Sequence, residues 1–115
     1  MEEVCVWFNP GCSKCRTARE LLEERDVAAE YFHYLDSEPG RADIERVMEL
    51  ARIDDPREMM RTSEALYQEL SLAEAHRDDL IEAMVHHPIL IERPIVIRGE
   101  RAVIARPPER LLELF

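Results

Sequence analysis

The alternation of hydrophobic and polar residues predicts a strand, a helix and a second strand near the start of the chain. Residues 4–8, VCVWF, form a short apolar run of strand-forming residues, and the NPG that follows favours a tight turn. Apolar residues then recur at helical spacing from residue 13 to about residue 25, which predicts a helix whose start lies at Cys12. Residues 30–35, EYFHYL, predict another strand, so these elements form a right-handed βαβ unit.

The middle of the chain has a helical pattern. Apolar spacing predicts three helices here, namely residues 41–52, a short piece capped by Ser63, and residues 77–87. Asp55 begins a further short helix, because Pro56 suits the first helical position and Glu58 completes the spacing of a capping box.

The last part of the chain, PIVIRGERAVIARPPERLLELF, predicts two strands joined at Gly99 and a C-terminal helix opened by Pro107 and Pro108. The order βαβ, helices, ββα is that of an α/β thioredoxin-like fold with a four-stranded mixed sheet. The helices at about residues 40–90 are then an insertion between the two halves. We expect one domain over residues 1–115, because 115 residues suit a single core.

Composition and charge narrow the class of protein. With 46% hydrophobic and 35% charged residues the chain is of ordinary globular type. Its formal charge of -10 disfavours binding to nucleic acid. No apolar stretch approaches the roughly 20 residues of a membrane span, and the first residues lack the layout of a signal peptide. We therefore expect a cytoplasmic protein that binds neither membranes nor nucleic acid.

Cys12 is the strongest candidate for chemistry. It lies where a strand gives way to a helix, so unpaired backbone N–H groups and the positive end of the helix dipole favour its thiolate. A free cysteine has a pKa of about 8.5, and lowering it increases the fraction of reactive thiolate at neutral pH. Lys14 and Arg16 add to this effect if their side chains fold back toward the sulfur.

The other two cysteines have different interpretations. Cys15 is either a resolving thiol, which would close a disulfide with Cys12, or a buried core residue on the face of Ala18. Cys5 is a small buried hydrophobe within the first strand. We expect no metal site, because His86 and His87 are adjacent on a helix and no second CxxC is present.

Three arginines lie at predicted element boundaries, where side chains can converge on a site. Arg61 lies between two short helices, Arg93 precedes Pro94 at the entrance of a strand, and Arg106 follows a strand. Guanidinium groups bind tetrahedral oxyanions bidentately, so a cluster of them would hold a phosphate-like ligand beside Cys12. Spacing alone does not show that the three meet, and Pro94 by itself also suits an ordinary start of a strand.

Four segments, FNPGCSKCR, LYQELSL, HPILIERPIVI and ARPPE, resemble the glutaredoxin-linked arsenate reductase family, whose relatives include Spx-type redox regulators. The resemblance implies a thioredoxin-like fold and reduction of arsenate to arsenite, with glutathione as co-substrate, glutaredoxin as partner and no bound cofactor. It also implies functional residues: Cys12 as nucleophile, Arg61, Arg93 and Arg106 on the oxyanion, Pro94 after a cis peptide bond, and Asn9 and Arg16 supporting the loop and the thiolate.

Two positions depart from that family. Phe8 stands where arsenate reductases of this type carry a histidine thought to activate the cysteine, and Cys15 stands where they carry a serine. A second thiol allows Cys12 to be resolved internally, which makes external glutathione less necessary. Two alternatives therefore stay open: a general thiol-disulfide oxidoreductase that uses both cysteines, and a Spx-type regulator that binds RNA polymerase.

Overall fold

The computed structural model describes residues 2–115, which divide into two compact units. One unit combines the chain up to Ser37 with Arg93–Phe115, and the other is Glu38–Glu92. The second unit coincides closely with the insertion expected at about residues 40–90. The expectation of a single domain over the whole chain stays a prediction.

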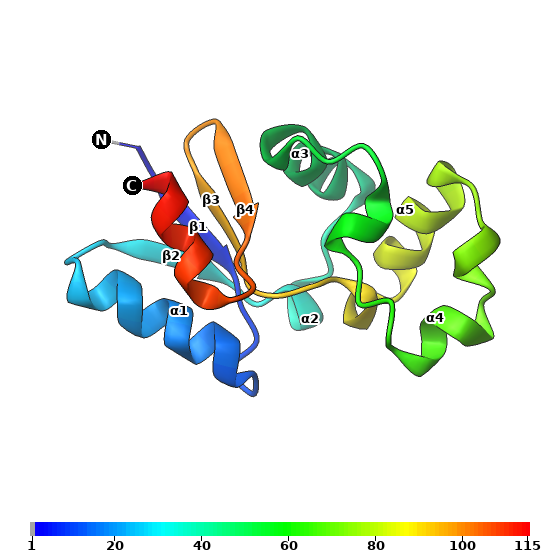
Figure 1. Cartoon of the computed structure of the whole chain (residues 1–115), viewed down its shortest axis with the longest axis horizontal. Helices are drawn as coiled ribbons and strands as arrows, with labels where there is room; N and C mark the ends of the chain where they lie inside the picture. Colours follow the sequence, from blue (N-terminus) through cyan, green and yellow to red (C-terminus); the bar gives the residue numbers. More distant parts are fainter. Residues whose placement is uncertain (1) are drawn as a thin grey trace. The chain divides into compact units, whose positions relative to one another are not determined.

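The first unit is built on a mixed sheet of four strands (Figure 1). The strands are β1 (Val4–Trp7), β2 (Ala29–Phe32), β3 (Ile95–Arg98) and β4 (Arg101–Ile104), in the order β2-β1-β3-β4. Strand β1 pairs parallel with β2 and antiparallel with β3, so that Val6 lies opposite both Tyr31 and Val96. The remaining pair, β3 and β4, is antiparallel and turns at Gly99, whose φ of 58° suits glycine. The predicted sheet is confirmed.

One face of this sheet is covered by helix α1 (Ser13–Glu24) and by the C-terminal 3₁₀ helix η4 (Pro108–Leu114). The buried residues of α1 are Cys15, Ala18 and Leu22, as the helical spacing predicts. They share a core with apolar side chains of β1, β3, β4 and η4. The end of the chain is helical as expected, but it is a 3₁₀ rather than an α-helix.

The prediction that the second strand runs through residue 35 is wrong. Pairing with β1 ends at Phe32, whose carbonyl accepts the N–H of Phe8 at 2.8 Å. The His33 carbonyl then accepts the N–H groups of Asp36 and Ser37, and this turn starts the short helix α2 (Tyr34–Ser37). Burial of the aromatic side chain drives the change, because Tyr34 stacks on Trp7 with ring centroids 6.3 Å apart.

The second unit consists of helices joined by loops, with one isolated antiparallel bridge between Met60 and Ile91. Its elements are α3 (Arg41–Ala51), η1 (Pro56–Met59), α4 (Ala65–Glu69), η2 (Leu72–Glu74), α5 (Arg77–His86) and η3 (Pro88–Leu90), the η elements being 3₁₀ turns. The cap of η1 is the predicted one: the Asp55 carboxylate accepts the Arg57 N–H at 3.0 Å, and the Glu58 carboxylate accepts the Asp55 N–H at 3.4 Å.

The predicted cap at Ser63 is wrong, because the residue that caps α4 is Glu64. The Glu64 N–H is bonded to the Arg61 carbonyl at 3.1 Å, so Ser63 lies inside the preceding turn rather than at the start of the helix. The loop after α4 is held by Arg57, whose guanidinium donates to the Tyr67 hydroxyl and to the carbonyls of Leu72, Ala73 and Ala75.

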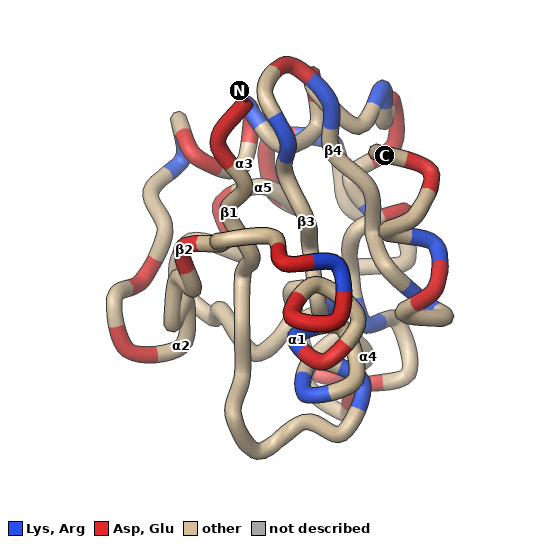
Figure 2. The backbone as a smooth tube through the Cα atoms, turned by 90° about the vertical axis from the view of Figure 1, so that its left-hand side faces the viewer, with Lys and Arg blue, Asp and Glu red and all other residues tan. Residues whose placement is uncertain are grey.

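Charge is distributed unequally between the two units. Residues 38–92 carry 14 acidic and 6 basic residues, whereas the rest of the chain carries 11 acidic and 9 basic residues. In the first unit both signs occur along α1 (Figure 2), with Lys14, Arg16 and Arg19 toward its N-terminus and Glu20, Glu23 and Glu24 toward its C-terminus. Within residues 2–115, no helix is both long enough and apolar enough to cross a membrane.

Candidate active site

Cys12 lies at the N-terminus of α1, where the loop after β1 turns into the helix. It is the N-cap residue, with extended backbone angles of φ -99° and ψ 123°, and it is 7% exposed. Asn9 shapes the loop, because its carbonyl accepts the Cys12 N–H at 3.0 Å and its side-chain oxygen accepts the Gly11 N–H at 2.9 Å. This turn places the sulfur beside the first N–H groups of the helix.

The surroundings of Cys12 favour its thiolate. Burial opposes ionisation, but the backbone N–H of Cys15, the thiol of Cys15, the positive charge of Arg93 and the backbone N–H of Lys14 together outweigh it and lower the Cys12 pKa. The helix N-terminus therefore acts as the sequence predicts. The cation that acts on the sulfur is Arg93, which is remote in sequence.

Cys15 has the opposite character. Its side chain has no exposed surface, and burial raises its pKa to about 12, with the neighbouring Cys12 adding to the rise and the backbone of Asn9 and the charge of Arg93 partly offsetting it. Cys5, expected from the sequence to be buried, is only half-buried on β1, and burial followed by the charge of Glu30 raises its pKa. All three cysteines are free thiols.

Arg93 and Arg106 meet at the start of β3 and the end of β4. The Arg106 guanidinium donates from Nη1 to the Arg93 carbonyl at 3.0 Å, and the Nε and Nη1 atoms of Arg93 are buried. Each arginine is followed by a cis peptide bond, to Pro94 and to Pro107. The fold thus brings Arg93 and Arg106 together, and Arg93 is close enough to Cys12 to act electrostatically on its thiol.

The other predicted site residues have local partners. The Arg16 guanidinium donates to the Pro10 carbonyl at 2.8 Å, so this side chain braces the loop before Cys12. Arg61 belongs to the helical unit, where its guanidinium pairs with the Glu64 carboxylate at 3.1 Å.

Phe8 is part of an aromatic cluster that the sequence analysis missed. The ring is buried, contacts Tyr31 edge to face at a centroid distance of 5.1 Å, and lies 5.7 Å from the His33 ring. The Arg19 guanidinium lies 5.1 Å from the same ring. In the segment EYFHYL, Tyr31 and His33 are two residues apart and so lie on the same face of a strand. This spacing was the one sequence feature that could have indicated the aromatic cluster. Position 8 therefore contributes packing, and activation of Cys12 comes from other groups.

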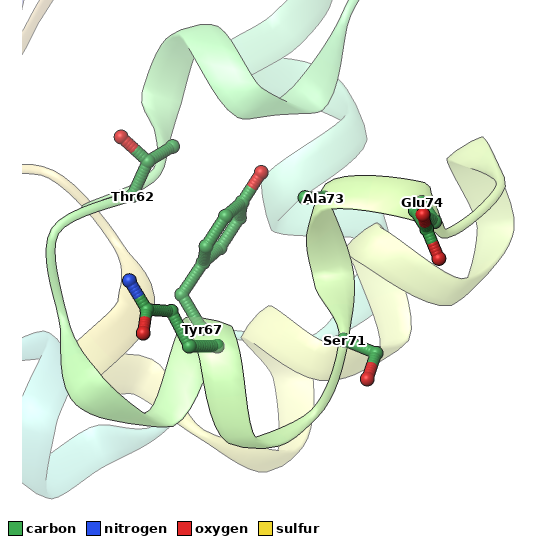
Figure 3. A pocket seen from close by; sticks show the side chains of 6 residues that line it. Thr62, Tyr67, Ser71, Ala73 and Glu74 are labelled. Atoms are coloured by element: carbon green, nitrogen blue, oxygen red, sulfur yellow. The ribbon is translucent and has the colours of Figure 1, made fainter.

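A cavity of about 340 Å³ lies in the helical unit, and Tyr67 projects into it from α4 (Figure 3). It is lined by Thr62, Tyr67, Gln68, Ser71, Ala73 and Glu74. These residues offer one carboxylate and neither a cation nor a thiol, which does not suit oxyanion chemistry. Across residues 2–115, no three His, Cys, Asp or Glu side chains gather in a way that could hold a metal ion.

Together, the sheet order and a cysteine capping the first helix define a thioredoxin-like protein with a thiol site. Comparison with known proteins specifies the class further: residues 7–114 match the ArsC family, and the chain belongs to that family. The resemblance noted in the sequence is thereby confirmed.

Similar proteins cover nearly the whole chain. An arsenate reductase of Neisseria meningitidis serogroup A is 40% identical over 113 residues, which is 96% of this chain and 97% of the relative. The uncharacterized protein YfgD of Escherichia coli is also 40% identical, over 98% of this chain and 97% of its own length. The solved structure of an arsenate reductase from Vibrio cholerae has a TM-score of 0.96 and 39% identity, covering 99% of this chain and 98% of that one.

Proposed function

We propose that this protein reduces arsenate to arsenite through the Cys12 thiolate. The observation that carries the proposal is the environment of Cys12, an N-cap thiol whose pKa is lowered by backbone N–H groups, by Cys15 and by Arg93. The arsenate reductases of similar sequence and structure support the choice of substrate.

The first step is substitution at arsenic. The Cys12 sulfur bonds to arsenic, an arsenic–oxygen bond breaks, and the departing oxygen takes a proton to leave as water. Two anions must approach each other in this step, so positive charge beside the sulfur is required. Arg93 and Arg106 supply it in the proposal. Arg61 is the third guanidinium that the family resemblance implies.

The second step transfers two electrons to arsenic. The glutathione thiol attacks the Cys12 sulfur, the sulfur–arsenic bond breaks with its electron pair going to arsenic, and the thiol proton passes to the arsenite that leaves. Arsenic falls from the +5 to the +3 state, and Cys12 is left in a mixed disulfide with glutathione. Glutaredoxin then reduces that disulfide. Three free thiols fit a reducing compartment, and we place the protein in the cytoplasm.

The test is arsenite formation by the purified protein with arsenate, glutathione and glutaredoxin. Cys12→Ser should abolish turnover, whereas the matched control Cys5→Ser should retain it because Cys5 lies away from the N-terminus of α1. Arg93→Gln and Arg106→Gln should raise KM for arsenate, and Arg61→Gln tests the third arginine in the same way.

Two results would reject the proposal. The first is turnover that survives Cys12→Ser. The second is a wild-type protein that ignores arsenate but reduces a protein disulfide, which would indicate a general thiol-disulfide oxidoreductase. Retention of RNA polymerase on the immobilised protein, without arsenite formation, would instead indicate a regulator of Spx type.

A further inference from the structure

We infer that the cavity of the helical unit is a binding site for an organic cation, an ammonium group carried on a short alkyl chain. The cavity has a volume of about 340 Å³ and is lined by residues of α4 and η2, by Ser71 between them and by Thr62. It lies wholly within Glu38–Glu92, whereas Cys12 belongs to the other unit. The inference therefore does not depend on the proposed reduction of arsenate.

Arg57 holds the walls of the cavity in place. Its guanidinium donates from Nε to the Tyr67 hydroxyl at 3.1 Å, and from Nη2 to the carbonyls of Leu72 at 2.9 Å and Ala75 at 2.8 Å. Between α4 and η2 the chain turns at Ser71, which has left-handed backbone angles of φ 56° and ψ 39°. These contacts fix the α4 and η2 sides of the cavity (Figure 3), so a ligand meets a site that is already formed.

The polar side chains of the lining are free to accept hydrogen bonds from a ligand. Within residues 2–115, four of these side chains have no hydrogen-bond or ion-pair partner, namely those of Thr62, Gln68, Ser71 and Glu74. Two hydroxyls, an amide oxygen and a carboxylate all offer lone pairs, and the carboxylate accepts without donating. An ammonium group, which donates N–H bonds and accepts none, is the chemical complement of this set.

The charge around the cavity selects a cation. Glu74 is the charged residue of the lining, and no basic side chain lines the cavity beside it. The nearby Arg57, which is bonded to the Tyr67 hydroxyl, is paired with the Asp55 carboxylate at 3.2 Å. Residues 38–92 carry 14 acidic and 6 basic residues, so the field of this unit attracts cations and repels anions.

The apolar part of the lining favours an alkyl chain over a bare metal ion. Tyr67 projects into the cavity from α4 (Figure 3), and its ring and the Ala73 methyl group suit contact with methylene groups. A hard metal ion takes about six oxygen ligands, and the lining supplies one carboxylate. The volume of about 340 Å³ suits a group the size of an amino acid side chain. A free alkylamine and the lysine side chain of a partner protein share this chemistry.

The experiment is an NMR titration of the full chain, labelled with nitrogen-15 and followed through its backbone amides. Two probes carry the ammonium group: butylammonium as a free amine, and acetyl-Gly-Lys-Gly-amide as a protein side chain. Butyrate and acetyl-Gly-Glu-Gly-amide are the matched anionic controls. We expect the cationic probes to shift the amides of residues 62–75 with a Kd of about 1 mM, and the anionic controls to leave them unchanged.

Two variants of the same unit test the role of charge. Glu74→Gln removes the charge of the lining at nearly constant shape, and it should weaken binding of the cationic probes about fivefold, the effect of a partly exposed ion pair. Glu69→Gln makes the same change on α4 but outside the lining, so it should leave the affinity nearly unchanged. The spectrum of each variant also shows whether it is folded, and the wild-type titration decides the question if a variant is not.

The relative affinity of the two cationic probes identifies the source of the ligand. Tighter binding of the peptide supports the lysine side chain of a partner protein, and tighter binding of butylammonium supports a free amine. The inference is overturned if neither cationic probe shifts residues 62–75, if the anionic controls shift them equally, or if Glu69→Gln weakens binding as much as Glu74→Gln. Because no arsenate is present, the result is independent of the proposed reaction.

Discussion

Raising the pH should destabilise the protein through Cys15. The pKa of this thiol is about 12 in the folded chain, because of burial and the neighbouring Cys12, against about 9.0 for a free cysteine thiol. The folded state therefore favours the protonated thiol. The resulting stabilisation is complete below the unfolded pKa and is lost as the pH rises toward the folded one.

The expected loss of stability follows from the difference in proton binding between the unfolded and the folded chain. Above roughly pH 9 the unfolded chain loses the proton and the folded chain keeps it, so the slope approaches about 1.4 kcal/mol per pH unit. Between about pH 8 and pH 10.5 the free energy of unfolding should fall on the order of 2 kcal/mol from this thiol. Solvent screening is small here, since the side chain has no exposed surface.

The assay is urea unfolding of the wild type and of Cys15→Ser across this pH range, with a reductant present. Serine does not titrate there, so the difference between the two curves isolates Cys15 from Cys5 and Tyr31, whose pKa values are also raised by burial. The wild type should lose stability more steeply than the variant. Parallel curves would refute the reasoning.

Three further predictions concern stability. Leu22→Ala should lower the free energy of unfolding by about 2–5 kcal/mol in urea titrations, because it empties part of the core under the sheet. Arg52→Gly should raise it by about 0.5 kcal/mol, since Arg52 ends α3 with left-handed angles of φ 58° and ψ 45°; a decrease would contradict this. Arg57→Lys should lower the melting temperature seen by circular dichroism, because lysine cannot match the bonds of the guanidinium to Tyr67 and to the carbonyls after α4; an unchanged melting point would argue against that role.

The features that sequence predicted well are local ones. The cap formed by Asp55, Pro56 and Glu58 needs only neighbouring residues, and the N-cap position of Cys12 needs only a helix that begins there. Ser63 was misassigned because serine suits turns as well as caps, and a hydrogen bond in the turn decided between them.

The features that sequence did not establish depend on contacts between distant residues. Spacing alone does not show that Arg93 acts on Cys12, since the two are separated by the whole helical insertion; only its place at an element boundary and the family resemblance pointed to it. The aromatic partners of Phe8 likewise depend on side-chain packing, which a pattern of hydrophobic positions does not specify.

Because the two units differ in charge, the formal net charge of -10 does not describe each unit equally. Most of that excess belongs to residues 38–92, while the stretch that holds Cys12, Arg93 and Arg106 is close to electrically balanced. Salt limits the reach of exposed charges to about 8–10 Å, so a small anion at Cys12 responds to the charges nearest to it rather than to the formal charge of the whole chain. Most of the acidity and the reactive thiol thus belong to different units, although Arg61, the third arginine of the proposed site, belongs to the acidic one.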